Sequence, residues 1–151
     1  MSFDFSTLVT DRTQADAAAR NDKGTYRSAD LNRVTEALED LESRLAALGY
    51  ITGYAPVYIL HLDGTTDTVW LEDDEDIRAD RIEAYRANVA SIRGAFTQLA
   101  ATPQTPADLE LLTWAEANDI ERILQAVDDS LRRMALSRWY SGEIYSGEAT
   151  E

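Results

Sequence analysis

The chain of 151 residues contains no cysteine, a single histidine and only three prolines. Without cysteine it can form no disulfide framework, no thiolate nucleophile and no metal site with cysteine ligands. Basic residues are also scarce, since 14 lysines and arginines stand against 28 aspartates and glutamates and give a formal charge of −14. A surface this negative repels phosphate groups. We therefore expect no direct binding to nucleic acid or to an anionic membrane, whereas a basic protein surface would be attracted.

Long apolar runs are absent too. The longest nearly apolar stretch, residues 55–62, is interrupted by Pro56 and His61 and is too short to span a bilayer. Residues 1–11 contain neither a basic region nor a long apolar core, so they do not resemble a secretory signal. With 44% apolar residues the chain can bury one core, and we expect one soluble unit.

Three segments space their apolar residues at alternating steps of three and four, which predicts heptad-patterned helices. Ser28 is the predicted N-cap of the first helix, and Gly49 is its predicted C-terminal stop. Thr113 to Glu116 form a capping-box motif for the last helix. The first segment contains Leu31, Val34, Leu38, Leu41, Leu45 and Leu48. The second contains Ile82, Tyr85, Val89, Ile92, Phe96 and Leu99. The third contains Ala117, Ile120, Leu124, Val127, Leu131 and Met134, with Ile123 and Ala135 widening the stripe.

These helices can bury their apolar stripes in two ways. The connection from Pro103 to Leu112 is short, which favours an antiparallel helical bundle within one chain. Strict heptads are also the narrow stripe of a coiled coil, so the first segment, from Leu31 to Leu48, is a candidate seam between subunits of a homo-oligomer.

The fold class predicted is mainly α, with a small β-hairpin and extended terminal arms. A short helix is expected over residues 13–21, capped by Thr10 or Asp11, within an N-terminal arm of residues 1–27. The helical bundle spans residues 28–139. A β-like insertion within it, residues 55–70, turns at Asp63-Gly64 and holds Pro56 at an edge.

The tetrapeptide Tyr-Ser-Gly-Glu occurs twice near the end of the chain, from Tyr140 and again from Tyr145. Gly142 and Gly147 are predicted to break the helix after Trp139, so residues 140–151 would form an extended arm. The arm could bind a partner or fold back over its own bundle, and the Phe3-Asp-Phe5 start raises the same two alternatives. The partner-binding candidates are Phe3, Phe5, Trp139, Tyr140, Ile144 and Tyr145.

No motif indicates catalysis, so we expect a protein without enzymatic activity and without a cofactor. His61 lacks a neighbouring nucleophile and a second imidazole, and a packed strand histidine is the more frequent case. The run Glu72 to Asp76 lacks the spacing of a calcium loop, so an acidic helix start is favoured over a weak divalent-ion site. Asn118 and Asp119 lie beside the third apolar stripe. They could fix register or contact a partner, but a local bend or a water-facing position is the more frequent outcome.

Three blocks of sequence carry a family resemblance. They are residues 10–16, residues 29–34 with Leu45, Gly49 and Tyr50, and residues 116–124 running into 139–143. Together they resemble a family of small proteins encoded by phages and prophages of Gram-positive bacteria, usually uncharacterised or described as virion or tail-associated. The segment 51–80 has no part in the resemblance.

The resemblance implies a non-enzymatic structural or adaptor protein of the virion, at the tail end or baseplate, made in the bacterial host cytoplasm. Its partners would be other tail or virion proteins. The alternative is an acidic regulatory or inhibitory module that binds a basic protein, because the charge of −14 would favour such a target.

Overall fold

The computed structural model describes residues 3–21, 23–61, 63–71, 79–95, 102–107, 109 and 112–148. The fold is mainly helical and includes one small antiparallel sheet. In chain order the elements are a 3-10 helix η1 (Phe5–Thr7), α1 (Gln14–Ala19), α2 (Ser28–Ala47), β1 (Ile59–Leu60), β2 (Thr66–Asp67), α3 (Ala79–Gly94) and α4 (Trp114–Glu148).

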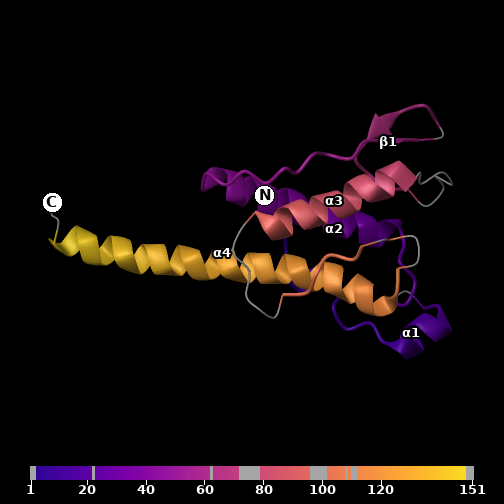
Figure 1. Cartoon of the computed structure of the whole chain (residues 1–151), viewed down its shortest axis with the longest axis horizontal. Coiled ribbons are helices and arrows are strands. Elements are labelled where there is room, and N and C mark those ends of the chain that lie inside the picture. The colour runs from indigo at the N-terminus through magenta and orange to yellow at the C-terminus, as the bar shows by residue number, and fades with distance from the viewer. Residues whose placement is uncertain are drawn as a thin grey trace.

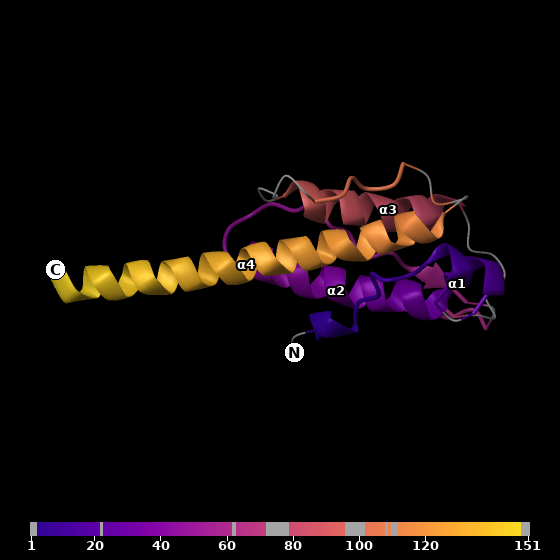
Figure 2. The same ribbon diagram turned by 90° about the horizontal axis from the view of Figure 1, so that it is seen from below.

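Helices α2, α3 and α4 each pack against the other two and form what we call the three-helix body. All three run in the same direction (Figures 1 and 2). Near the start of α2, Arg33 bonds to Glu121 near the start of α4, and further along α2, Arg44 bonds to Asp128 further along α4. Tyr26, just before α2, bonds to Tyr85 in the first half of α3. The predicted antiparallel arrangement is therefore wrong.

Long connections make the parallel arrangement feasible. Because α3 ends at Gly94, well before Pro103, residues 95–113 separate it from α4 instead of a short turn. A helix of 16 residues is about 24 Å long, which about eight extended residues can retrace. Within this connection, the Pro103 carbonyl accepts from Arg93 Nε at 2.6 Å, which holds Pro103 beside the end of α3.

Two asparagines hold extended segments against α2 and α3. Asn88 of α3 pairs with the backbone N–H and C=O of Ala55, at 3.0 and 2.8 Å. Asn32 of α2 pairs in the same way with Trp70, at 2.7 Å to the N–H and 2.8 Å to the C=O. Each amide side chain satisfies one donor and one acceptor of a residue that lies in no strand, which removes the cost of leaving them unpaired.

The ends of the helices follow local chemistry. At the end of α2, Gly49 has φ +91°, and the Tyr50 N–H donates to Leu45 O at 3.0 Å, which is the Schellman arrangement. The predicted capping box of α4 is confirmed, because Glu116 N donates to Thr113 Oγ1 and Thr113 N donates to Glu116 Oε1, both at 3.1 Å.

Two predicted caps lie elsewhere. Arg27 is the cap of α2, with its N–H bonded to Asp30 Oδ2 at 2.8 Å, instead of Ser28. Thr13 caps α1, instead of Thr10 or Asp11, through a reciprocal pair of hydrogen bonds with Asp16.

The core lies inside the three-helix body. The leucines and valine proposed as an oligomer seam on α2 are buried within one chain, except for half-buried Leu48, so this face is not free for a second subunit. The buried members are Leu31, Val34, Leu38, Leu41 and Leu45. From α3 and α4 the core receives Tyr85, Val89, Ile92, Ala117, Ile120, Ile123, Leu124, Val127 and Leu131. Ile82 and Met134 are partly buried against it, while Phe96, Leu99 and the side chain of Ala135 lie outside the described residues.

The predicted hairpin is present but short. β1 and β2 pair antiparallel with Ile59 opposite Asp67 and Leu60 opposite Thr66, and Gly64 in the turn has φ +85°. The buried ring of His61 lies 2.7 Å (Nε2) from Asp67 Oδ1 and links the two sides of the hairpin. That hydrogen bond lowers the pKa of the Asp67 carboxyl, with a second bond from Val69 N–H acting in the same direction.

α4 extends far beyond its partners (Figures 1 and 2). It continues through both copies of Tyr-Ser-Gly-Glu to Glu148. The prediction of an extended arm is therefore wrong for residues 140–148. One glycine inside a helix costs about 1 kcal/mol relative to alanine, whereas each added helical residue gains a hydrogen bond without a new nucleation cost. From Leu131, the last buried residue among those whose side chains are described, the helix continues for about 25 Å to Glu148.

Replacing Gly142 and Gly147 by alanine should stabilise this projecting part. Gly142 lies inside α4 and Gly147 is its next-to-last residue, so the double variant should gain helicity, with about 1 kcal/mol of stabilisation from site 142 and less from site 147. Far-ultraviolet circular dichroism and amide hydrogen exchange over residues 140–148 would measure the gain. An unchanged spectrum with unchanged exchange would contradict the continuous helix.

Gly49→Ala is the matched control, and its expected sign is opposite. An added Cβ at residue 49 would meet nothing within 4 Å, so the effect comes from the backbone angle of +91° alone. We expect a loss of about 1 kcal/mol in the free energy of unfolding.

Candidate functional site

Four buried or half-buried charged side chains meet beneath the N-terminal segment, which we define as residues 3–12. We call this set the charge cluster: Arg12, Asp30, Arg33 and Glu121. The Glu121 carboxylate is fully buried and accepts from Arg12 Nη2 at 2.6 Å and from Arg33 Nε and Nη2 at 2.8 Å each. Asp30 Oδ1 accepts from Arg33 Nη2 at 2.5 Å and Arg12 Nη2 at 3.2 Å. Two cations thus balance two anions, and charge-assisted bonds satisfy both carboxylates.

The three-four spacing of α4 explains why Glu121 is buried. Residue 121 falls four after Ala117 and three before Leu124, both of which face the core. Asp30 and Arg33 occupy the first turns of α2, directly beside Leu31 and Val34. An acid at a core position needs a buried cation, because an isolated charge there would cost several kcal/mol. The spacing contained this signal, but our sequence analysis did not identify it.

Asn118 attaches the N-terminal segment to α4. Its side chain is 2% exposed, and its amide pairs with Arg12 N and Arg12 O, each at 3.0 Å. The expectation that Asn118 faces water or caps a bend is therefore wrong, and the rarer reading of a register-fixing residue describes it better. Asp119, one residue on, is half-buried and lies 3.6 Å from Arg122.

Two tyrosines close the cluster on its α3 side. The hydroxyls of Tyr26 and Tyr85 lie 2.6 Å apart, and the guanidinium carbon of Arg12 lies 5.5 Å from the centre of the Tyr26 ring. Burial raises the pKa of both phenols above the usual value, so both stay neutral at physiological pH. Neutral hydroxyls can share one hydrogen bond here without adding a charge.

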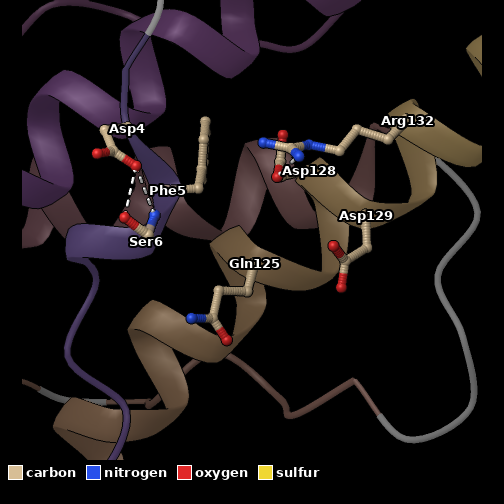
Figure 3. A pocket seen from close by; sticks show the side chains of 7 residues that line it. All are labelled: Asp4, Phe5, Ser6, Gln125, Asp128, Asp129 and Arg132. Atoms are coloured by element: carbon tan, nitrogen blue, oxygen red, sulfur yellow. Dashed lines mark hydrogen bonds and ion pairs between the residues drawn. The ribbon is translucent and has the colours of Figure 1, made fainter.

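A second ionic group lies further along α4. Asp128 accepts from Arg44 Nη1 at 2.8 Å and lies 2.9 Å from Arg132 Nε, and Arg44 also reaches Asp40 at 3.2 Å. Beside it is a cavity of about 350 Å³ between the N-terminal segment and α4 (Figure 3). Its lining consists of Asp4, Phe5, Ser6, Gln125, Asp128, Asp129 and Arg132. The lining offers carboxylates, an amide and a guanidinium, which can bind polar groups but do not form a nucleophile with an adjacent base.

The predicted partner-binding residues have different outcomes. Phe5 is buried in the core and packs against Phe3 edge to face at 5.0 Å, while the guanidinium of Arg44 lies 5.7 Å from the Phe5 ring. Phe5 is thus an internal anchor, and its assignment to a partner surface is wrong. Phe3 is partly buried against the same core. Trp139, Tyr140, Ile144 and Tyr145 lie on the projecting part of α4, and their side chains are outside the described residues.

Exposed apolar side chains gather on the hairpin and its flanks. Tyr58, Leu60, Val69 and Leu71 are 55%, 62%, 47% and 46% exposed. We call these four residues the hairpin surface. They alternate with buried Ile59 and Trp70, so one side of each segment packs on the body and the other faces outward. The hairpin lies at the end of the body opposite to the projecting part of α4 (Figure 1). The hairpin was predicted from the sequence, whereas its outward face was not.

Metal and membrane sites gain no support from the part of the chain that is described. There, no group of three or more histidine, aspartate or glutamate side chains is arranged to hold a metal ion. The acidic run from Glu72 to Asp76 lies outside the described residues. None of the described helices is both long enough and apolar enough to cross a bilayer.

Comparisons with known proteins return no relatives. No family model, no curated protein and no solved structure matches the chain.

Glu121→Gln should strongly destabilise the fold. The substitution keeps the shape of the side chain but removes a buried negative charge, so Arg12 and Arg33 share only Asp30. Removing one partner of a buried ion pair typically costs about 3–5 kcal/mol, a large part of a typical stability of about 5–15 kcal/mol. Urea unfolding followed by circular dichroism would measure the loss, and a change below about 1 kcal/mol would contradict the role of the cluster.

Asp119→Asn is the matched control on the same helix. Asp119 is partly exposed and has one long contact with Arg122 at 3.6 Å, so we expect a change within about 0.5 kcal/mol.

Proposed function

We propose that the chain is a non-enzymatic structural or adaptor protein of a phage particle, at the tail end or baseplate. The observation that carries this proposal is the projecting part of α4, which extends about 25 Å past Leu131 as a single helix (Figure 2). A lone helix in water is marginal unless packing stabilises it. A second protein surface would supply that packing.

The sequence of the projecting part supports such a contact. Leu136, Tyr140 and Ile144 recur at steps of four, and Trp139 falls beside Tyr140. On a helix these positions share one side, which is the pattern of an amphipathic helix that docks into a groove or onto another helix. Tyr145 comes five residues after Tyr140 and is therefore about 140° away around the helix. We infer that the stripe from Leu136 to Ile144 is the principal contact.

The hairpin surface offers a second contact at the other end of the body. Its exposed apolar side chains are of the kinds found at protein interfaces, with a tyrosine among them. Two separate surfaces on one small body are what an adaptor needs, because each can hold a different neighbour. The partners we propose are other tail or virion proteins and further copies of the chain, and contact through α4 replaces the seam first expected on α2.

The alternative, an acidic module that binds a basic protein, is favoured by one observation, the formal charge of −14. The arginines that pair with Asp30, Glu121 and Asp128 inside the fold are already counted in this figure, so these pairs leave the net charge unchanged. Binding of this kind would weaken steeply with salt. Docking of an apolar stripe would not.

Purified particles provide the test of the proposed function. Prophage induction in the bacterium that encodes the chain, followed by density-gradient purification, should recover the protein in the particle band in fixed ratio to other virion proteins by quantitative mass spectrometry. Recovery only in the soluble fraction, together with salt-sensitive binding to a basic protein, would favour the acidic module instead.

Substitutions on the projecting helix should separate the contact from stability. Trp139→Ser with Ile144→Ser should leave the thermal unfolding of the three-helix body unchanged, because α4 extends beyond α2 and α3 at this end (Figures 1 and 2), while incorporation into particles falls at least about tenfold. Tyr145→Ser is the matched control and should incorporate normally. Equal incorporation of all three proteins would count against the proposed contact.

A further inference from the structure

The N-terminal segment is held by the helices in the way that a protein holds a bound peptide. Side chains of α2 and α4 bond to its main chain near both of its ends. Asp40 accepts from Phe3 N at 3.3 Å, Glu121 Oε1 accepts from Val9 N at 2.9 Å, and Arg122 Nη2 donates to Thr10 O at 3.1 Å. Asn118 then pairs with both main-chain groups of Arg12. We call this face of α2 and α4 the segment site.

Three side chains anchor the segment in the site. Phe5 and Leu8 belong to the core at 5% and 7% exposure, and Arg12, at 4%, supplies one of the two cations of the charge cluster. Anchors at steps of three and four, combined with main-chain hydrogen bonds, give both specificity and affinity in peptide recognition. The site is therefore complementary to this particular sequence.

The chain between the segment and α2 is folded mostly on itself. None of the residues of α1 is buried, its capping bonds join Thr13 to Asp16, and the Asn21 side chain donates to Asp16 at 2.9 Å. Tyr26 and Arg27 stay in place, since Tyr26 bonds to buried Tyr85 and Arg27 caps α2. Residues 13–25 would reach about 43 Å if they were extended. They can thus be moved without opening the core, and they are long enough to deliver the segment to a neighbouring molecule.

We propose that the segment site also accepts the N-terminal segment of a second copy of this chain, so that copies held close together exchange their segments. Each exchanged segment makes the same anchors and the same bonds to α2 and α4 as before, and exchange gives up only the bonds of Arg12 and Asp11 to Lys23 in the connection. The advantage of the chain's own segment is its effective concentration, which for a short tether is in the millimolar range. Dilute protein keeps its own segment, and crowded copies exchange.

The proposal goes beyond the proposed function and does not rest on it, because every contact in it comes from a single chain. It concerns a different surface from the projecting helix and the hairpin surface. A failure of exchange would leave the particle test untouched, and a protein absent from particles could still exchange segments.

The absence of cysteine permits a clean test in the full-length chain. Ser6 and Asp129 are exposed and line the same cavity from opposite partners, the segment and α4 (Figure 3). A Ser6→Cys protein and an Asp129→Cys protein would be mixed, incubated for hours to days, and treated with a short bismaleimide. A covalent heterodimer can form across the cavity only if the segment of one copy occupies the site of the other.

The expected result is a heterodimer whose yield rises with concentration. At about 1 mM, near the effective concentration of the tether, it should exceed by at least about tenfold the yield at a hundredfold dilution. Because the copies repel each other at a charge of −14, added salt should raise the yield further. A synthetic peptide of residues 3–13 should suppress the cross-link, and the same peptide with Arg12→Glu should not.

Two controls make the result decisive. A mixture of the Ser6→Cys and Glu83→Cys proteins measures the cross-linking that random collision produces, because Glu83 is an exposed residue on α3. The double variant Ser6→Cys with Asp129→Cys measures how often the segment occupies the site of its own chain. A heterodimer no more abundant than the collision control at about 1 mM, with complete cross-linking inside the double variant, would overturn the proposal. Gln125→Cys, which lines the same cavity, can replace Asp129→Cys if that variant fails to fold by circular dichroism.

Discussion

The buried carboxylate of Glu121 is the interaction on which the rest of the structure depends. It joins three parts of the chain that are far apart in sequence: the N-terminal segment through Arg12 and Val9, α2 through Arg33, and α4 itself. A charge of this kind is tolerated only when all its partners are in place, because an incomplete set leaves ions without water or counter-charge. The cluster thus specifies which helix faces which, and in which register, more sharply than apolar contacts alone would. Asn32, Asn88 and Asn118 do the same for the main chain, one on each helix of the body.

Much of the fold was predictable from the sequence, because local patterns determine local structure. The three-four spacing placed three helices, Gly49 ended one of them, and the box from Thr113 to Glu116 began another. The direction of the helices was not predictable in this way. It depends on the length of the connections and on pairs such as Arg33 with Glu121, which no local pattern encodes. The charge cluster was missed for a related reason: an acid at a core position looks like an ordinary surface residue until its cation is known.

The two errors about the termini have different physical origins. Serine and glycine after Trp139 were judged by their local preference for irregular chain, and the start with Phe3 and Phe5 was expected either to bind a partner or to fold back over its own bundle. In the structure the helix that begins at Trp114 continues past Gly142 at small cost, so α4 runs on to Glu148. At the other end Phe5 and Leu8 find a core to enter, and the segment that carries them becomes part of the body. Helix continuation thus decided the C-terminal end, and tertiary packing decided the N-terminal end.

The common direction of α2, α3 and α4 has a mechanical consequence. Any load applied to the far end of α4 is transmitted along an axis that the three helices share, so it acts on their contacts in shear. The apolar layers, the pair Arg44–Asp128 and the cluster around Glu121 would then resist together instead of separating one after another, as they would if α4 were peeled away sideways. Under axial tension the molecule should act as a stiff link, and under sideways force it should yield from the end near Met134 first.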